Sequence, residues 1–212
     1  KYLGGMGIQY ESEMVYQSLK KELEDKNIIF CSIEDAIKNH SDLVKKYLGK
    51  LIKNDEHRYS ALNSTLFSGG SFIYVPKNTI LNRPLQSYFR IDTENLGQFE
   101  RTLIIIDDNS KVSYIEGCTA PITSLDSLHA ANVEVYVGKN SSFRFTFSSF
   151  NIFLFFTFQI MIMTYCYIFI ISTNINLLSF FYLFTTFIYS HIHNCFFITK
   201  FTNIFYFFYF FC

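Results

Sequence analysis

Cys118 is the residue whose type and position best suit chemistry in this 212-residue chain. It follows a short run, Val112 to Glu116, that is expected to be a strand, so the thiol would lie where that strand ends. Gly117 leaves room for another group to approach closely, and Pro121 ends the run because proline has no backbone donor. A thiol presented in this way can act as a nucleophile or carry a persulfide sulfur.

The reactive form of Cys118 is the thiolate, so the charges around it decide whether it reacts. Glu116 would oppose ionisation of the thiol, whereas Arg90 or Arg101 would favour it if the fold brings either of them near. An inert buried cysteine is the alternative, because an unbridged cysteine often behaves as a small apolar residue. Spacing alone does not decide between the two.

Histidines and a cysteine near the C-terminus offer a second possible site. His191, His193 and Cys195 alternate along the chain, so a strand would place all three on one face, where they could serve as metal ligands. Their surroundings are almost entirely apolar and aromatic, which argues against a metal site. We therefore assign no metal ligands, and we interpret His129, at the start of an expected strand, as structural.

Three asparagines mark a repeat. Asn78, Asn109 and Asn140 follow one another at intervals of 31 residues, each with a β-branched residue three places earlier and a hydroxyl residue directly after it. Asparagine tolerates the left-handed backbone that tight turns need. A fixed period of this length indicates coils stacked on one another, so we predict a β-solenoid from residue 71 onward, most simply a parallel β-helix. A β-sandwich with similar turns is the alternative.

The first 70 residues predict an α+β region. Residues 11–26 are expected to form an amphipathic helix, 28–31 a strand and 59–67 a helix. Ser32 and Ser41 are expected to cap helix N-termini, and Gly49 is expected to end a helix in the left-handed conformation. The glycines at 4, 5 and 7 lack the preceding strand and the Lys-Ser/Thr of a phosphate-binding loop, so a flexible lead-in is expected there.

The charges are distributed unevenly. Lys+Arg and Asp+Glu number 18 each, so nothing in the charge balance marks the chain as a nucleic-acid binder, which would need a basic face. Lys200 is the single charged residue after residue 146, and the segment 147–212 contains no Gly, Ala, Val, Pro, Asp, Glu, Arg or Trp.

The five cysteines form no C-x-x-C pair, which favours a reducing compartment. Because the chain begins with Lys1 inside a readable segment, we expect a truncated N-terminus.

Two hypotheses account for the tail, residues 147–212. Its composition is typical of AT-rich DNA read in a wrong frame or of unspliced sequence, which would leave the tail structurally unassigned. Alternatively, residues 152–172 are uncharged and long enough for a membrane-like helix. Translation of the source DNA in the other frames would separate the two.

Several sequence blocks between residues 27 and 146 are more specific than these patterns. They are NIIFCS, ALNS, GGSFIYVPK, YFRIDTENLGQFERT, EGCTAP and SLHAANVEVYV, in this order and without large gaps. Together they resemble the SufB-type scaffolds of the SufB/SufD family, which assemble iron–sulfur clusters. The resemblance covers about residues 5–146.

The resemblance implies a partial right-handed parallel β-helix flanked by helical regions, and a scaffold rather than an enzyme. It implies that Cys118 accepts sulfur and that Arg90, with Asp92 two residues later, lines an internal sulfur path. The intact family holds an iron–sulfur cluster transiently and works with the SufC ATPase, SufD and a cysteine desulfurase or sulfur-transfer protein. Where the family has asparagine this chain has Asp92, so Arg90 and Asp92 are expected to share a strand face. An ion pair in the lining of the path and an ion pair at the surface are the two alternatives.

The match ends after Thr146, so the cluster ligands and SufC-docking helices of the family have no counterpart, and no stable cluster is expected on this chain alone. We therefore divide the chain into an α+β region (1–70), a partial β-helix core (71–146) and the tail (147–212). A plastid or apicoplast-type organelle is the expected location, with a bacterial cytoplasm as the alternative. The competing functional hypothesis is a membrane-anchored β-solenoid whose tail is a genuine transmembrane segment.

Overall fold

The structure is a computed structural model that describes most of the chain. It describes residues 2–55, 58–93, 97–119, 128–150, 155–164, 168–174, 189–190, 196–202 and 205–211. The side chains described belong to residues up to 146, apart from those of Tyr59, Leu128 and His129.

A β-hairpin opens the chain and corrects the helix expected over residues 11–26. β1 (Gly5–Tyr10) pairs antiparallel with β2 (Glu13–Leu19), and only α1 (Lys21–Glu24) is helical within that range. β1 also pairs in parallel with a later strand, so the edge of a sheet recruits residues whose own sequence pattern favours a helix. The glycines are not a flexible lead-in either. A Cβ on Gly5 would lie 2.9 Å from both Leu19 and Phe30, so glycine permits this packing.

Three further helices follow β3 (Ile29–Ser32). They are α2 (Ile33–Asn39), α3 (Ser41–Tyr47) and α4 (Arg58–Leu66). Ser32 caps α2 as expected, because its Oγ accepts a hydrogen bond from the Asp35 N–H at 3.1 Å. Gly49 has a left-handed φ of +73°, also as expected. Ser41 is not a cap; it is the first residue of α3, whose N-terminal flanking residue is His40.

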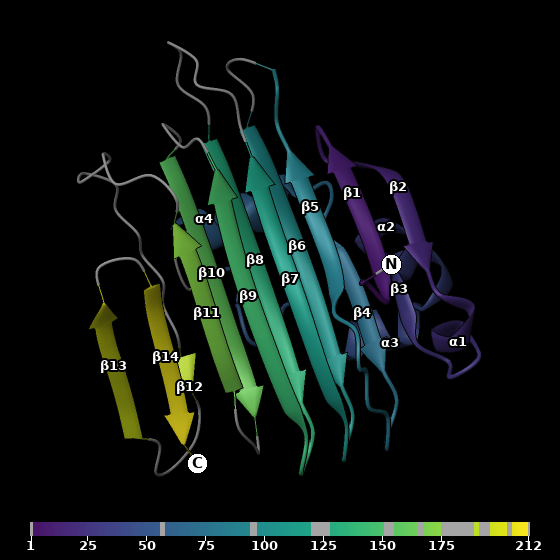
Figure 1. The fold of residues 1–212 in the computed structure, drawn as a ribbon. Helices are drawn as coiled ribbons and strands as arrows, with labels where there is room; N and C mark the ends of the chain where they lie inside the picture. Colours follow the sequence, from purple (N-terminus) through teal and green to yellow (C-terminus); the bar gives the residue numbers. More distant parts are fainter. Residues whose placement is uncertain are drawn as a thin grey trace.

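From residue 71 the strands alternate between two sheets (Figure 1). The first sheet receives β4 (Ser71–Val75), β6 (Gly97–Ile106) and β8 (Leu128–Val137), and the second receives β5 (Leu85–Arg90), β7 (Lys111–Thr119) and β9 (Ser142–Phe150). Neighbouring strands within each of these sets are parallel. Phe72 lies opposite Leu103, and Leu103 lies opposite Glu134, so the sheet register reproduces the 31-residue period of the sequence. This topology is compatible with a β-helix, whose right-handed form stays a prediction.

The asparagine-marked turns stack on one another. Asn78, Asn109 and Asn140 have φ values of 60°, 57° and 55°, which confirms their predicted left-handed conformation. Asn109 Nδ2 donates to Asn78 Oδ1 at 3.0 Å, and Asn140 Nδ2 donates to Asn109 Oδ1 at 3.4 Å. The hydroxyl residue after each turn continues the column, since the Ser110 N–H donates to Ser141 Oγ at 2.9 Å.

Replacement of Asn109 tests the importance of its left-handed backbone. We expect Asn109→Ala to lower the free energy of unfolding by about 1–2 kcal/mol, because alanine keeps the Cβ that is crowded at positive φ but lacks the amide whose local hydrogen bonds let asparagine tolerate this conformation. Asn109→Gly removes the same amide but relieves that crowding, so its loss should be smaller by about 1 kcal/mol. Urea unfolding midpoints of the full chain provide the measurement. Equal losses in the two variants would show that the side-chain ladder, rather than the backbone conformation, carries the effect.

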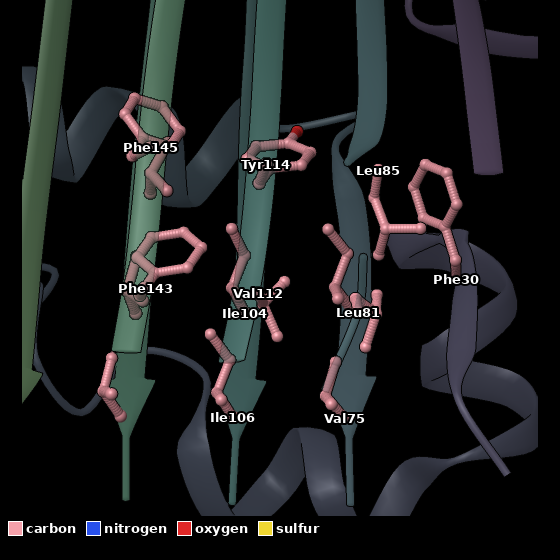
Figure 2. Close-up of a cluster of buried hydrophobic side chains, with 14 of the residues drawn as sticks. Phe30, Val75, Leu81, Leu85, Ile104, Ile106, Val112, Tyr114, Phe143 and Phe145 are labelled. Atoms are coloured by element: carbon pink, nitrogen blue, oxygen red, sulfur yellow. The ribbon is translucent and has the colours of Figure 1, made fainter. Parts of the chain in front are cut away.

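Apolar side chains fill the space between the two sheets next to these turns. Figure 2 shows them in rows across neighbouring strands, with Ile106 beside Val75 and Phe145 beside Tyr114. The Tyr114 and Phe145 ring centroids are 5.6 Å apart. A second apolar cluster, which includes Ile33, Phe72 and Leu103, packs helix α2 against the outer face of the β4–β6–β8 sheet.

The described parts of the tail are strands, and the membrane-like helix expected over 152–172 stays a prediction. They are β10 (Phe155–Thr164), β11 (Ile168–Asn174), β12 (Tyr189–Ser190), β13 (Phe196–Thr202) and β14 (Phe205–Phe211). β10 extends the sheet beyond β8, and β11 extends the other sheet beyond β9. Among the described residues, no helix has both the length and the apolar character that a membrane crossing requires.

Candidate functional site

Cys118 lies inside the molecule. Gly117, Cys118 and Thr119 continue strand β7, so the strand extends beyond Glu116, where the sequence was expected to end it. Cys118 lies opposite Phe89 of β5 in the backbone register, and its side chain is 2 % exposed. Because side chains alternate along a strand, Cys118 shares the inward face of β7 with Val112, Tyr114 and Glu116. The thiol therefore lies within the space between the two sheets.

The interior is divided into an apolar end and a polar end. Near the asparagine turns the inward residues are apolar, but farther along the same strands they become polar. We call this second group the polar interior cluster, and it consists of Gln9, Ser71, Ser87, Gln98, Glu100, Thr102, the Tyr114 hydroxyl, Glu116 and Cys118. All of these residues are buried, and they come from β1, β4, β5, β6 and β7.

Hydrogen bonds join the cluster across the two sheets. Ser71 Oγ and Ser87 Oγ are 2.7 Å apart, which places the middle of β5 over the start of β4. The Tyr114 hydroxyl donates to Glu116 Oε2 at 2.9 Å. Burial, and next the charge of Glu116, raise the pKa of Tyr114 well above its ordinary value, so the phenol remains a donor. The Gly70 N–H donates to Gln9 Oε1 at 2.9 Å and so fixes the other edge of the cluster.

Two glutamines leave polar atoms unused in this interior. Gln98 is 0 % exposed, and among the described residues neither its Nε2 nor its Oε1 has a hydrogen-bond partner. Gln9 Nε2 likewise has no described partner. Buried polar groups are nearly always hydrogen-bonded, to protein or to water. The cluster is therefore suited to hold a small polar occupant beside the Cys118 thiol.

Arg90 and Asp92 form the ion pair that the sequence suggests, with 2.8 Å between Arg90 Nε and Asp92 Oδ2. The Arg90 side chain is 51 % exposed, and on β5 it faces away from the side that carries Phe89. The structure therefore does not bring Arg90 or Asp92 to the inward face of Cys118. Arg101 is also apart from it: its guanidinium lies on the outer side of β6, where Nη2 donates to the Ile52 carbonyl at 3.1 Å.

The second cysteine with a described side chain, Cys31, has a different environment. It lies in the outer apolar cluster near α2, and burial, with Asp35 and Glu34, raises the pKa of its thiol to about 12. Cys31 is therefore protonated at neutral pH and is a poor nucleophile. His191, His193 and Cys195 lie outside the described residues. Within the described part of the chain, no group of three His, Cys, Asp or Glu side chains is placed to hold a metal ion.

The motifs of the sequence did not indicate most of the polar interior cluster. A signal was available in Gln98, Glu100 and Thr102, which alternate with other residues just before the apolar run of β6. That alternation places all three on one strand face. Assigning the face to the interior required knowledge that Ile104 and Ile106, which continue the same alternation, belong to the core.

Two family models match consecutive parts of the chain. Residues 8–87 match the SufBD protein N-terminal region, and residues 89–151 match the SufBD core domain of the SUF system for FeS cluster assembly. These matches cover the hairpin, the helices and strands β4 to β9.

Curated relatives carry the same family name. Iron-sulfur cluster assembly SufBD family proteins of Staphylococcus saprophyticus and Staphylococcus aureus strain MRSA252 are 54% and 53% identical to this chain over 146 residues. A Staphylococcus haemolyticus relative is 52% identical over the same length. Each alignment covers 69% of this chain and 31% of the relative, so the chain spans about a third of the length of the relatives it matches. These relatives are bacterial and give no support to a plastid origin. Through residues 8–151, this chain belongs to the SufBD family of iron–sulfur cluster assembly proteins.

Proposed function

We propose that this chain contributes a SufB-type scaffold segment to iron–sulfur cluster assembly and that Cys118 is its sulfur acceptor. The observation that supports this role is the position of Cys118, which belongs to the buried apolar cluster but lies where the interior changes from apolar to polar residues. An inert core cysteine would have only apolar neighbours, whereas Cys118 shares its strand face with Glu116 and lies at the end that carries Gln98 and Glu100.

The chemistry is a transfer of sulfane sulfur between thiols. The Cys118 thiolate attacks the terminal sulfur of a donor persulfide, R–S–SH. A new S–S bond forms at Cys118 Sγ, the donor S–S bond breaks, and the donor leaves as the thiolate R–S⁻. Atoms and electrons balance without an external oxidant or reductant. A cysteine desulfurase or its sulfur-transfer protein is the donor in this proposal.

The rest of the assembly follows from family membership and is part of the same proposal. SufC and SufD are the partners, the iron–sulfur cluster is a transient cargo, and the chain is a scaffold rather than an enzyme. The proposed architecture is an α+β region (1–70), a partial right-handed β-helix (71–146) and a tail (147–212), of which residues 147–151 still match the family core-domain model. The bacterial relatives favour the bacterial cytoplasm over a plastid.

A persulfide-labelling experiment tests the proposal. After incubation with a cysteine desulfurase and cysteine, or with a small alkyl persulfide, we expect peptide mass spectrometry to find one added sulfur on Cys118. Cys31→Ser should retain this label and Cys118→Ser should lose it, because burial, with the neighbouring carboxylates of Asp35 and Glu34, keeps the Cys31 thiol protonated. A parent chain that folds but gains no sulfur on Cys118 would remove this cysteine from the mechanism.

A further inference from the structure

The proposed sulfur transfer leaves one requirement unmet, because the Cys118 thiol must lose its proton inside the protein. Its 2 % exposure gives water little access to the thiol. A thiolate formed there without a nearby proton acceptor would be a new buried charge, which is costly. The described part of the chain places no arginine or lysine on the inward face beside it, since Arg90 and Arg101 both lie on outward faces.

The polar interior cluster instead presents two carboxylates. Glu116 is two residues from Cys118 on the same face of β7, and its side chain is buried. Glu100 is buried on the inward face of β6, which faces β7 from the other sheet. The contact between Ser71 and Ser87 fixes how the two sheets are aligned. In one sheet, Ser87 pairs with Glu116. In the other sheet, Ser71 lies beside Thr102, because the next residues, Phe72 and Leu103, are paired.

This alignment places Glu100 near the thiol. Thr102 of β6 faces the row of paired residues in the other sheet that contains Glu116. Glu100 comes two residues before Thr102 on the same strand face, so it faces the neighbouring row, which contains Cys118. The Gly70–Gln9 hydrogen bond agrees with this alignment, because Gln9 lies in the row of Phe89 and Cys118, and Gly70 precedes Ser71. The thiol therefore lies between one carboxylate on its own strand and another on the strand across the interior.

We infer that Glu100 and Glu116 together form the proton-accepting site for the Cys118 thiol; this inference rests on the proposed function and deepens it. Two carboxylates in one desolvated space do not both ionise readily, so the pair holds about one negative charge and a raised affinity for a proton. The Cys118 proton passes to the ionised carboxylate, and the negative charge moves to sulfur. Charge is relocated within the cluster rather than created there.

A second observation supports a binding site rather than two carboxylates with a purely structural role. Gln98 is two residues before Glu100 on the same inward face, is 0 % exposed, and leaves both amide atoms without a described partner. Its N–H₂ group is a donor suited to a persulfide anion or a water molecule beside the carboxylates. The other inward groups of β1 and β5, Gln9, Ser87 and Phe89, do not titrate. Tyr114 on β7 titrates only far above neutral pH, because burial and Glu116 raise its pKa.

The test measures ionisation of Cys118 separately from sulfur acceptance. The full-length parent chain and the variants Glu100→Gln, Glu116→Gln and their double variant react with methyl methanethiosulfonate across a pH series. Peptide mass spectrometry follows the rate at Cys118. We expect each single variant to shift the rate profile to higher pH by about one unit, a tenfold slower reaction near neutral pH. Without the carboxylate, the thiol must ionise directly.

Ser113→Ala is the control, because it alters the same strand β7 on its outward face, outside the polar interior cluster, and its profile should coincide with that of the parent. If the carboxylates only repelled the thiolate, their removal would shift the profile to lower pH; that shift, or no shift in either folded single variant, would overturn the inference. Thermal unfolding identifies which variants fold, and one folded single variant is enough to carry out the test. A shifted profile on a chain that accepts no persulfide would refute the proposed function and leave the inference standing.

Discussion

Gly70→Ala is expected to lower the free energy of unfolding by at least about 4 kcal/mol and to prevent stable folding of the full chain. Gly70 has a φ of +124°, a region that side-chain-bearing residues rarely adopt. A Cβ at this position would lie 1.9 Å from the carbonyl oxygen of Arg101 and 2.5 Å from its carbonyl carbon. Both atoms belong to the backbone of β6, so no side-chain movement relieves the clash.

The damage would extend to the polar interior cluster. Gly70 precedes β4, and its N–H donates to Gln9 Oε1. Moving Gly70 away from β6 would therefore disturb the first β4–β6 pairs and the position of Gln9 together.

Gly49→Ala is the matched control for this prediction. Gly49 also has a positive φ, +73°, but a Cβ there would meet no atom within 4 Å. Its substitution should cost only the left-handed strain of about 1–2 kcal/mol. Denaturant unfolding followed by circular dichroism measures both variants. Similar losses at the two positions would show that strained φ alone, rather than close contact with β6, explains the requirement for glycine at residue 70.

Glu134→Gln is expected to lower the free energy of unfolding by about 3 kcal/mol. Glu134 projects from the outer face of β8, where its carboxylate accepts hydrogen bonds from three backbone N–H groups that follow α3: those of Gly49 at 2.7 Å, Leu51 at 2.9 Å and Ile52 at 3.0 Å. An amide has a single oxygen, so in either orientation its N–H₂ group faces at least one of these buried N–H donors.

Arg101 makes Glu134 more important still. The Arg101 guanidinium donates a hydrogen bond to the Ile52 carbonyl, and the negative charge of Glu134 attracts the positive charge of Arg101. Loss of the carboxylate would leave this buried cation without its counter-charge and release the segment 49–52 from β8. Hydrogen exchange should therefore accelerate most at the three backbone amides whose hydrogen bonds Glu134 accepts. Glu13→Gln, an exposed carboxylate on β2, should change the stability by less than about 0.5 kcal/mol. Equal effects in the two variants would contradict this account.

The local features that a few consecutive residues control were readable from the sequence. The 31-residue spacing of Asn78, Asn109 and Asn140 predicted left-handed turns, and the structure stacks their amides. Ser32 and Gly49 also behave as expected, because capping depends on one side chain or one φ value. The blocks around EGCTAP pointed to the family that the comparisons show.

The tertiary structure decided which side of each strand is inside and which segments become strands at all. Residues 13–19 have a helical pattern, yet they complete the edge of a sheet. Arg90 and Cys118 both come from the blocks that resemble the family, but the alternation of side chains along each strand places one outward and the other inward. Glu100, 18 residues before Cys118 in the chain, reaches the same interior only because β6 and β7 lie in facing sheets. Turns and caps arise from local backbone energies, whereas a buried polar site arises from long-range burial, which no single segment specifies.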